Sequence, residues 1–453
     1  MQPLPKEFEE QMKRLLGEAG FFAYLDALNQ PYTRALRVNL LLRPDGTPPC
    51  PIEGLGAPVP WAKGAYFVEG DARPGLSPLH EGGLFYMQEP SALTAVTALD
   101  PQPGERVLDL CAAPGGKSTQ IAALMAGRGL LCCNEPIPSR AQILSRNIER
   151  MGVRNAVVLS AMPDALAPRF PAFFDRILVD APCSGEGMFR RQPEARDEWD
   201  ADAPRRCADR QMEILAQAAK MLRPGGTMVY STCTFNDTEN EGVLKRFLAL
   251  HPEFSLVPFA LPGLPEAKDG YLHLYPHEMR GEGHFVSRLK KADGADEADA
   301  PVQAAPQRKA PARAAAKSKA PAPIALPDVF SDAFAPERLY TAGDALWMLP
   351  EGISIERLSG LRVLRTGLLL AHTEGKRSEP DHALAMALRP EEAARTASLT
   401  QTQALAYQAG ETLSLGDLPG GYTLLCCEGV SLGWGKQAGG LMKNHYPKGL
   451  RRR

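Results

Sequence analysis

Two cysteines of the chain stand in turns that directly follow apolar segments. Cys183 lies in DAPCSGEG after the run RILVD, and Cys233 lies in STCTF after GTMVY. Proline, serine, threonine and glycine surround both thiols, which is typical of exposed turns. A thiolate that adds to carbon 6 of cytosine makes carbon 5 nucleophilic enough to attack a sulfonium methyl group. A second group must then remove the proton from carbon 5, and Cys183 is placed for that step. The cysteines inside apolar runs are interpreted as small core residues instead: Cys132, Cys133, Cys426 and Cys427.

Two charged residues near these turns complete the predicted chemistry. Asp180 opens the Pro-Cys turn, so its carboxylate could hydrogen-bond the ring nitrogen or amino group of a cytosine. A free cysteine ionises near pH 8.5 and needs a neighbouring positive charge to react at neutral pH, which Lys117 could supply. A base inside a duplex is out of reach, so the substrate should be unpaired or flipped.

The segment DLCAAPGGKST follows one apolar run and opens a helical pattern, which predicts a tight turn that binds a cofactor. Replacing Gly116 by a bulky residue should fill space that the cofactor needs. A phosphate-binding loop is disfavoured because Cys111 stands where its first glycine should be, and the dinucleotide fingerprint is absent. A purely structural turn is the plain alternative. The predicted cofactor residues of this turn are Cys111, Ala112, Ala113, Pro114, Gly115, Gly116 and Lys117.

Two carboxylates further along the chain are candidates for the same ligand. Glu135 ends the apolar run LLCCN, where a carboxylate can accept both hydroxyls of a ribose. Asp164, after the next apolar run, could reach the adenine or ribose edge, but it could equally cap a helix. The sequence does not separate these two roles of Asp164.

The elements that must position these residues alternate between short apolar runs and helical patterns from about Gly83 to Leu289. This alternation predicts a doubly wound parallel α/β sheet within residues 76–291. Ligands bind at the carboxyl ends of such strands, so both cysteines should face the crevice that holds the cofactor.

Flanking segments differ in composition. Residues 1–75 combine a helical opening, the strand-like RALRVNLLL and Pro- and Gly-rich turns, which indicates a small accessory lobe. Residues 292–325 are rich in Ala and Pro and are predicted to be a linker. Apolar and aromatic residues return at Leu326, so residues 326–453 should fold separately and end in a β-rich module around GYTLLCCEGVSLGW.

Composition excludes several classes of protein. The chain has 453 residues, 44% hydrophobic and 23% charged, which fits a soluble globular protein of two or three domains. No run of about eighteen apolar residues is present, and we expect a cytoplasmic monomer without membrane contact. Nine cysteines without metal-ligand spacing predict neither disulfides nor a metal site.

The net charge of −2 means that any nucleic-acid surface must be local. From Gly420 onward there are six basic residues against one Glu, interleaved with aromatic side chains, which is typical of RNA binding. A solvated tail is the alternative. The predicted RNA-binding residues are Trp434, Lys436, Lys443, Lys448, Arg451 and Arg452.

These motifs resemble a known family. DLCAAPGGK, DAPCSGEG and STCTF, with RVNLLL and GLFYMQEPSA upstream, are similar to the Sun-type (Fmu-like) RNA cytosine-5 methyltransferases. The ending GWGKQAGGLMKNHYPKGLR is similar to the RsmF subgroup of ribosomal RNA enzymes. The resemblance implies a Rossmann-like methyltransferase domain, S-adenosyl-L-methionine as cofactor and a C-terminal PUA-like domain. It also implies ribosomal RNA or the ribosomal subunit as partner, with 16S RNA as substrate.

Within the resemblance, Cys233 corresponds to the nucleophile and Cys183 to the residue that promotes product release. The loop from Cys111 to Lys117, with Glu135 and Asp180, corresponds to the cofactor site. The family has a carboxylate or amide after the third strand, but an ungapped register places Met162 there, and Asp164 fits only after a shift.

Two other functions stay open from the residues. A DNA cytosine-5 methyltransferase would carry its nucleophile in the Pro-Cys turn and would lack the second thiol. A ribosome-assembly factor could keep the fold without the chemistry. Both cysteines, the GGK turn and Glu135 favour the RNA-modifying enzyme.

Overall fold

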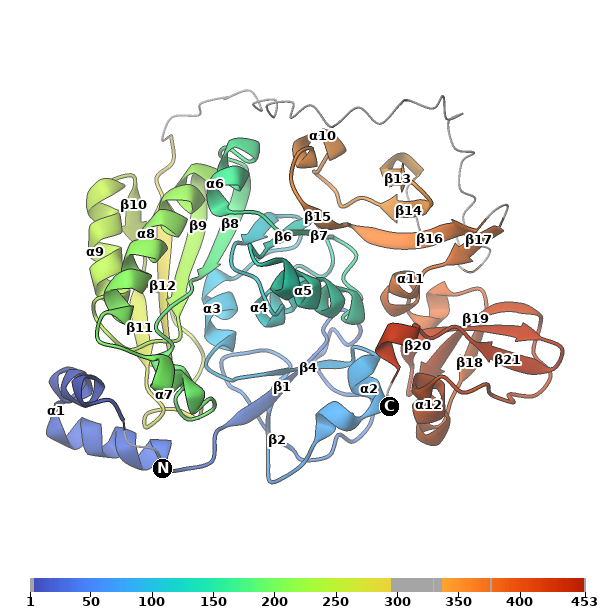
Figure 1. Cartoon of the computed structure of the whole chain (residues 1–453), viewed down its shortest axis with the longest axis horizontal. Helices are drawn as coiled ribbons and strands as arrows, with labels where there is room; N and C mark the ends of the chain where they lie inside the picture. The colour runs from blue at the N-terminus through green and yellow to red at the C-terminus, as the bar shows by residue number, and fades with distance from the viewer. Residues whose placement is uncertain (1–3, 295–328, 330–335, 375–376, 452–453) are drawn as a thin grey trace.

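The computed structural model describes residues 4–294, 329, 336–374 and 377–451 (Figure 1). Most of the predicted linker at 292–325, from residue 295 onward, lies outside the described residues. Three layers form the middle of the molecule, with one sheet between two sets of helices (Figure 1).

The central sheet is parallel in its middle and antiparallel at both edges. Its main path runs through β10 (Phe254–Leu256), β12 (His284–Lys291), β9 (Leu222–Thr232), β8 (Phe174–Asp180), β5 (Arg106–Asp109), β6 (Leu130–Asn134), β7 (Ala156–Leu159) and β15 (Val363–Thr366), and β11 (Tyr271–Leu274) pairs with β12. The predicted doubly wound fold is confirmed. Continuous apolar runs form these strands because both faces of the sheet are covered by helices.

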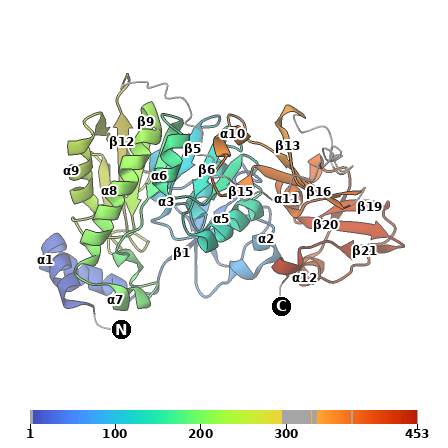
Figure 2. The same cartoon turned by 45° about the horizontal axis from the view of Figure 1, so that its top comes forward.

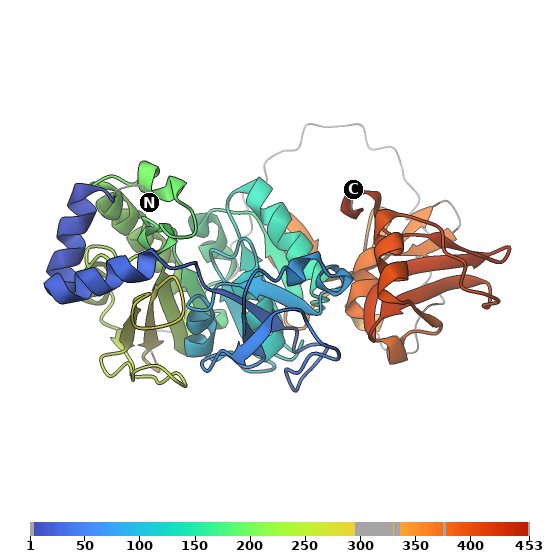
Figure 3. The same cartoon turned by 90° about the horizontal axis from the view of Figure 1, so that it is seen from below.

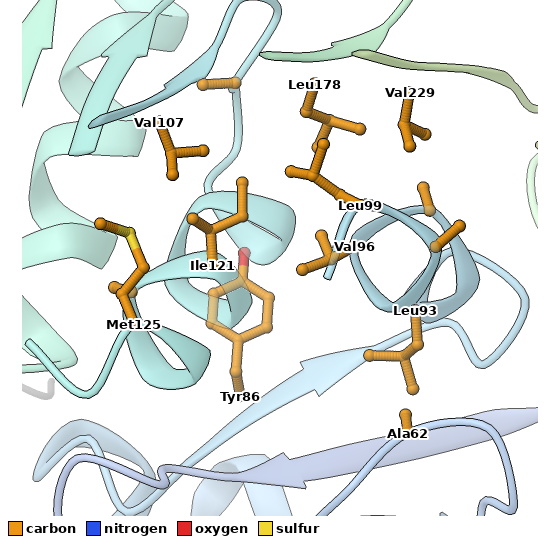
Figure 4. Packing of buried hydrophobic residues seen from close by; sticks show 14 of the residues in the cluster. Ala62, Tyr86, Leu93, Val96, Leu99, Val107, Ile121, Met125, Leu178 and Val229 are labelled. Carbon is orange, nitrogen blue, oxygen red and sulfur yellow. The ribbon is translucent and has the colours of Figure 1, made fainter. Parts of the chain in front are cut away.

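Alternate residues of one strand enter two different cores. Leu131 and Cys133 pack in one cluster, and Leu130 and Cys132 pack in the other. The first cluster lies under α3 (Leu93–Leu99), α4 (Gly116–Leu124) and α5 (Pro138–Arg150), and Figure 4 shows part of it. The second lies under α6 (Pro163–Leu166), α8 (Ala203–Met221) and α9 (Asn240–Leu250). Cys132 and Cys133 are therefore core residues, as predicted.

The N-terminal lobe is a helix and a small antiparallel sheet. The sheet has the order β2 (Leu55–Pro58), β3 (Ala65–Val68), β1 (Arg34–Val38) and β4 (Phe85–Gln88). Because β4 belongs to this sheet, the lobe extends past the predicted boundary at residue 75. The helix α1 (Lys6–Leu28) places Phe8 and Tyr24 in a cluster with Phe189 and Trp199, close to the Pro-Cys turn.

The C-terminal region contains two further sheets. One joins β13 (Leu339–Ala342), β14 (Ala345–Met348), β16 (Leu368–Glu374) and β17 (Arg377–Pro380), and the other joins β18 (Thr396–Ser398), β19 (Gly421–Cys427), β20 (Val430–Ala438) and β21 (Leu441–Asn444). The predicted β-rich module around GYTLLCCEGVSLGW corresponds to β19 and β20.

The predicted separate region of residues 326–453 is joined to the central sheet, because β15 pairs with β7 and extends that sheet (Figure 2). The last module also packs against the N-terminal lobe, where Leu36 and Phe85 share a cluster with Tyr407 and Leu432. Figure 3 shows the lobe and this module side by side.

Candidate active site

The carboxyl ends of the parallel strands open into a cleft of about 790 Å³. Each of β5, β6, β7, β8 and β9 ends at this edge of the sheet, so the turns after them supply the lining. The predicted site residues that line the cleft are Cys111, Ala113, Glu135, Asp164, Asp180, Cys183 and Cys233. Turns distant in the sequence thus converge as predicted.

Cys183 and Cys233 are in direct contact. Their Sγ atoms lie 3.1 Å apart, and the Cys233 backbone N–H donates to Cys183 Sγ at 3.4 Å. The hydrogen bond with Cys233, together with burial, raises the pKa of Cys183 well above its usual value. Cys183 is therefore protonated, and its S–H can donate to the sulfur of Cys233.

Asp180 is fixed on both carboxylate oxygens. Lys117 Nζ donates to Oδ2 at 2.8 Å, Ser231 Oγ donates to Oδ1 at 2.8 Å, and His284 Nε2 lies 3.4 Å from Oδ1. Burial by itself would raise the pKa of Asp180, but Lys117 and His284 hold it below its usual range. The carboxylate is therefore ionised, and it can only accept hydrogen bonds from a ligand.

Lys117 lies where the sequence predicted a positive charge. Burial lowers its pKa, but attraction to Asp180 and, to a lesser extent, to Cys233 raises it above the usual value. Lys117 is therefore charged, and Asp180 is its direct partner.

The opposite end of the cleft offers groups for a nucleoside. Glu135 is 3% exposed, and its carboxylate accepts the Ile137 N–H at 3.0 Å and lies 3.4 Å from Arg140 Nη1. The apolar side chains of Ile137 and Met162 are 49% and 61% exposed and also line the cleft. Asp164 lies beside Met162, so the structure places both alternatives for the third strand in the same wall.

The glycines of the predicted cofactor turn have a different role from the expected one. A Cβ atom at Gly116 would lie 3.2 Å from Tyr86 Cε1 and 3.4 Å from Gln88 Cδ, so Gly116 faces β4 and not the cleft. Gly115 has φ 113° and would meet Leu144 at 3.2 Å. Among the described residues, those that line the cleft include Cys111 and Ala113 of this turn but not Ala112, Pro114, Gly115, Gly116 or Lys117. These two glycines therefore allow close packing, and the expected clash with a cofactor at Gly116 is corrected.

A buried polar network beneath the thiols was not predicted. Glu239 accepts the Ser184 N–H at 3.2 Å, Asn236 Nδ2 at 2.8 Å and Gln211 Nε2 at 2.7 Å. Glu186 accepts the backbone N–H groups of Phe235 and Asn236. The network fastens the Pro-Cys turn to the Thr-Cys turn. Acidic residues next to both motifs were the available signal, but their burial follows only from the fold.

The described basic residues predicted to bind RNA lie in the last sheet and in the segment that follows it. Lys436 and Lys443 are opposite each other on β20 and β21, Lys443 and Lys448 are exposed, and Arg451 is half-buried. Trp434 is an exception, because its ring is 2% exposed and its Nε1 donates to the Asp381 carbonyl at 2.8 Å. Trp434 is a core residue and cannot stack on a base, which corrects that prediction. Arg452 lies outside the described residues.

Two further observations concern other kinds of site. Within the described part of the chain, no group of three or more His, Cys, Asp or Glu side chains could hold a metal ion. In the same residues, every helix is too short or too polar to cross a membrane.

Four family models match consecutive parts of the chain. They are described as the N-terminal domain of 16S rRNA methyltransferase RsmF (residues 4–90), 16S rRNA methyltransferase RsmB/F (96–290), the RsmF rRNA methyltransferase first C-terminal domain (327–388) and the methyltransferase RsmF PUA domain (394–452). These ranges follow the lobe, the central sheet and the two C-terminal sheets.

Whole-length relatives agree. The chain is 34% identical to ribosomal RNA small subunit methyltransferase F of Erwinia tasmaniensis, over 98% of the chain and 96% of that protein. It is 35% identical to the protein of the same name from Enterobacter sp., over 98% and 95%.

Solved structures support the fold. A methyltransferase homolog protein from Pyrococcus horikoshii is 30% identical, with a TM-score of 0.53 over 63% of this chain and 95% of that one. NSun6 from Pyrococcus horikoshii has a TM-score of 0.57 over 64% and 98%, at 24% identity. The fold is that of an S-adenosylmethionine-dependent methyltransferase. The chain belongs to the RsmB/F family of 16S rRNA methyltransferases.

Proposed function

We propose that the protein methylates carbon 5 of a cytosine in 16S ribosomal RNA through a covalent adduct with Cys233. The observation that carries this proposal is the pair of thiols 3.1 Å apart beside an ionised Asp180 in one cleft. A methyltransferase acting on an already nucleophilic atom needs no thiol, whereas carbon 5 of a pyrimidine needs covalent activation.

The chain offers groups that fit S-adenosylmethionine at one end of the cleft. The Glu135 carboxylate suits the ribose hydroxyls, and the exposed apolar faces of Ile137 and Met162 suit an adenine ring. Asp164 and the Cys111 turn complete this wall. When bound, the cofactor supplies an electrophilic methyl group.

The residues at the other end would act on the base. The Cys233 thiolate adds to carbon 6, and the displaced electron pair makes carbon 5 nucleophilic. After methyl transfer, the proton on carbon 5 must leave and the bond between Cys233 and carbon 6 must break, which restores the double bond of the ring. Cys183, in contact with Cys233, can donate its proton to the departing Cys233 sulfur and, as the resulting thiolate, accept the proton from carbon 5.

Asp180 supports cytosine as the target. An ionised carboxylate accepts hydrogen bonds but donates none, so it suits the amino group of cytosine and repels the corresponding oxygen of uracil. For the RNA chain, Lys436 and Lys443 present two positive charges on adjacent strands, an arrangement that a negatively charged RNA backbone would stabilise.

The division of labour between the thiols gives the test. Cys233→Ser should abolish both methyl transfer and the covalent complex. Cys183→Ala should still form the adduct and transfer the methyl group, then stall before release. Denaturing gels with labelled 16S RNA should therefore show a slow protein–RNA band for Cys183→Ala and none for Cys233→Ser or the double variant. A band in Cys233→Ser that is lost in Cys183→Ala would reverse the roles, and full activity in both variants would contradict the mechanism.

A further inference from the structure

His284 is a buried residue next to a carboxylate that lines the cleft. It begins β12, which pairs antiparallel with β9 so that Phe285 lies opposite Thr232 and His284 comes level with Cys233. Its side chain is 3% exposed and does not line the cleft. His284 can therefore affect the chemistry only through a neighbouring residue that lines the cleft.

That neighbour is Asp180. His284 Nε2 lies 3.4 Å from Asp180 Oδ1, and Ser231 Oγ donates to the same oxygen at 2.8 Å. Asp180 and Ser231 are register partners on β8 and β9, and β12 is the next strand. The two strands that follow β8 in the sheet, β9 and β12, thus each place a polar side chain at the Asp180 carboxylate.

The contact between His284 and Asp180 falls short of a fully formed hydrogen bond. Among the described residues, Nε2 has no partner that meets the geometry of a hydrogen bond, and a buried ring nitrogen without one is unfavourable. Catalytic hydrogen bonds are often long before substrate binds and shorten in the complex. Because Nε2 and Oδ1 are already 3.4 Å apart, a modest reorientation of the two side chains would be enough to complete this hydrogen bond.

We propose that His284 is a positioning residue that donates from Nε2 to Asp180 Oδ1 and, with Lys117 and Ser231, holds that carboxylate toward the target base. The inference rests on the proposed function, because it gives Asp180 the base as its partner. Lys117 bonds only to Oδ2. Without His284, the other carboxylate oxygen, Oδ1, is therefore held only by the Ser231 hydroxyl. A carboxylate free to turn would meet the base in the productive orientation less often.

The effect should fall on turnover and not on cofactor affinity. Glu135 and Met162, which face the nucleoside, follow β6 and β7, whereas His284 stands on the far side of β9. Loss of the imidazole should leave the dissociation constant for S-adenosylmethionine unchanged.

The test measures adduct formation in a single turnover, with His284→Phe and His284→Gln each placed in the Cys183→Ala background. Phe keeps the buried ring but cannot donate, and we expect it to slow adduct formation at saturating RNA by about tenfold or more. Gln can donate, and it should restore the rate to within about threefold of the parent. Ser287→Ala, buried on the same strand and bonded to the Tyr230 carbonyl instead of Asp180, is the matched control and should keep the parental rate.

Three results would overturn the proposal. An unchanged rate in His284→Phe shows that Asp180 needs no help from His284. Equal losses in the Phe, Gln and control variants, in step with lower melting temperatures, show a packing role only. If the parent Cys183→Ala protein itself forms no adduct, the proposed function fails and the inference fails with it, and this result is recognisable because it does not depend on residue 284.

Discussion

Asp109 is a fully buried carboxyl at the end of β5 and does not line the cleft. Its Oδ2 accepts Ser118 Oγ at 2.6 Å, and its Oδ1 has no hydrogen-bond partner among the described residues. Burial is the largest cause that raises the pKa of Asp109 to about 7, and the nearby Asp180 adds to it. The folded protein thus holds a proton that the unfolded chain would release near pH 4.

This proton makes stability depend on pH. Because the folded pKa of Asp109 is raised, its contribution to the free energy of unfolding is fully present below pH 4 and is lost as the pH rises toward about 7. Asp109→Asn removes the titration. Between pH 5 and pH 8, the wild type should lose about 2 kcal/mol more stability than Asp109→Asn, measured by urea unfolding. Equal losses would mean that Asp109 is ionised throughout.

The local sequence identified the two thiols, but it did not identify the polar residues that surround them in the fold. Cys183 and Cys233 stand in polar turns after apolar runs, so their local sequence is distinctive. His284 lies in a segment typical of any strand, and Glu239 lies in one typical of a solvated helix start. Their role depends on burial and on cross-strand neighbours, which local sequence does not report. Trp434 is the opposite case. The basic residues near it in the sequence suggested an RNA contact, but its ring lies in the core.

The middle of α8 forms one wall of the cleft next to the Pro-Cys turn. Gln211 Nε2 donates to the Pro182 carbonyl at 3.0 Å, and the adjacent Arg210 is exposed and lines the cleft. Lys117 and Arg140 already pair with Asp180 and Glu135. Arg210 has no ion-pair partner within the described parts of the chain. Its charge is therefore available to a phosphate of the RNA.

Arg210→Ala should weaken RNA binding and lower the salt dependence of that binding by about one phosphate contact. Affinity for S-adenosylmethionine should stay the same, because the side chain would contact only the RNA backbone. Binding isotherms at several salt concentrations give both quantities. Arg206→Ala is the matched control, since this arginine is exposed on the same helix but pairs with Asp200 at 2.6 Å. If both variants change the slope equally, Arg210 has no special contact.

The order of strands and helices between Gly83 and Leu289 could be predicted because each buried strand leaves a continuous apolar run. The position of β15 could not. Val363–Thr366 looks like any short strand, and nothing in it specifies which sheet edge it joins. That choice depends on β7 being an open edge and on groups such as Glu149, which pairs with the buried Arg365.

The described parts of the chain form one connected body. Arg154 Nη2 of the methyltransferase domain pairs with Glu392 at 2.5 Å, and Gln408 Nε2 donates to the Pro78 carbonyl at 3.0 Å. Composition located the lobe and the C-terminal region, but contacts across more than 200 residues leave no local pattern. A truncation that removes the RNA-binding surface would therefore also disturb the folded core.

Deleting residues 327–453 should accordingly destabilise the methyltransferase domain. The Ser160 N–H donates to the Arg362 carbonyl at 2.9 Å, and Leu358 packs in the core under α8. Without β15, the edge of β7 is open to water, so the Ser160 amide should exchange with deuterium much faster while β5 and β8 in the middle of the sheet stay protected. A deletion of residues 394–453 alone keeps β15 and is the matched control: it should leave Ser160 protected but speed exchange in β1 and β4, whose side chains pack on that module. Unchanged Ser160 protection in the longer deletion would show that the central sheet does not depend on β15, and the C-terminal region would then be an independent unit as its sequence suggested.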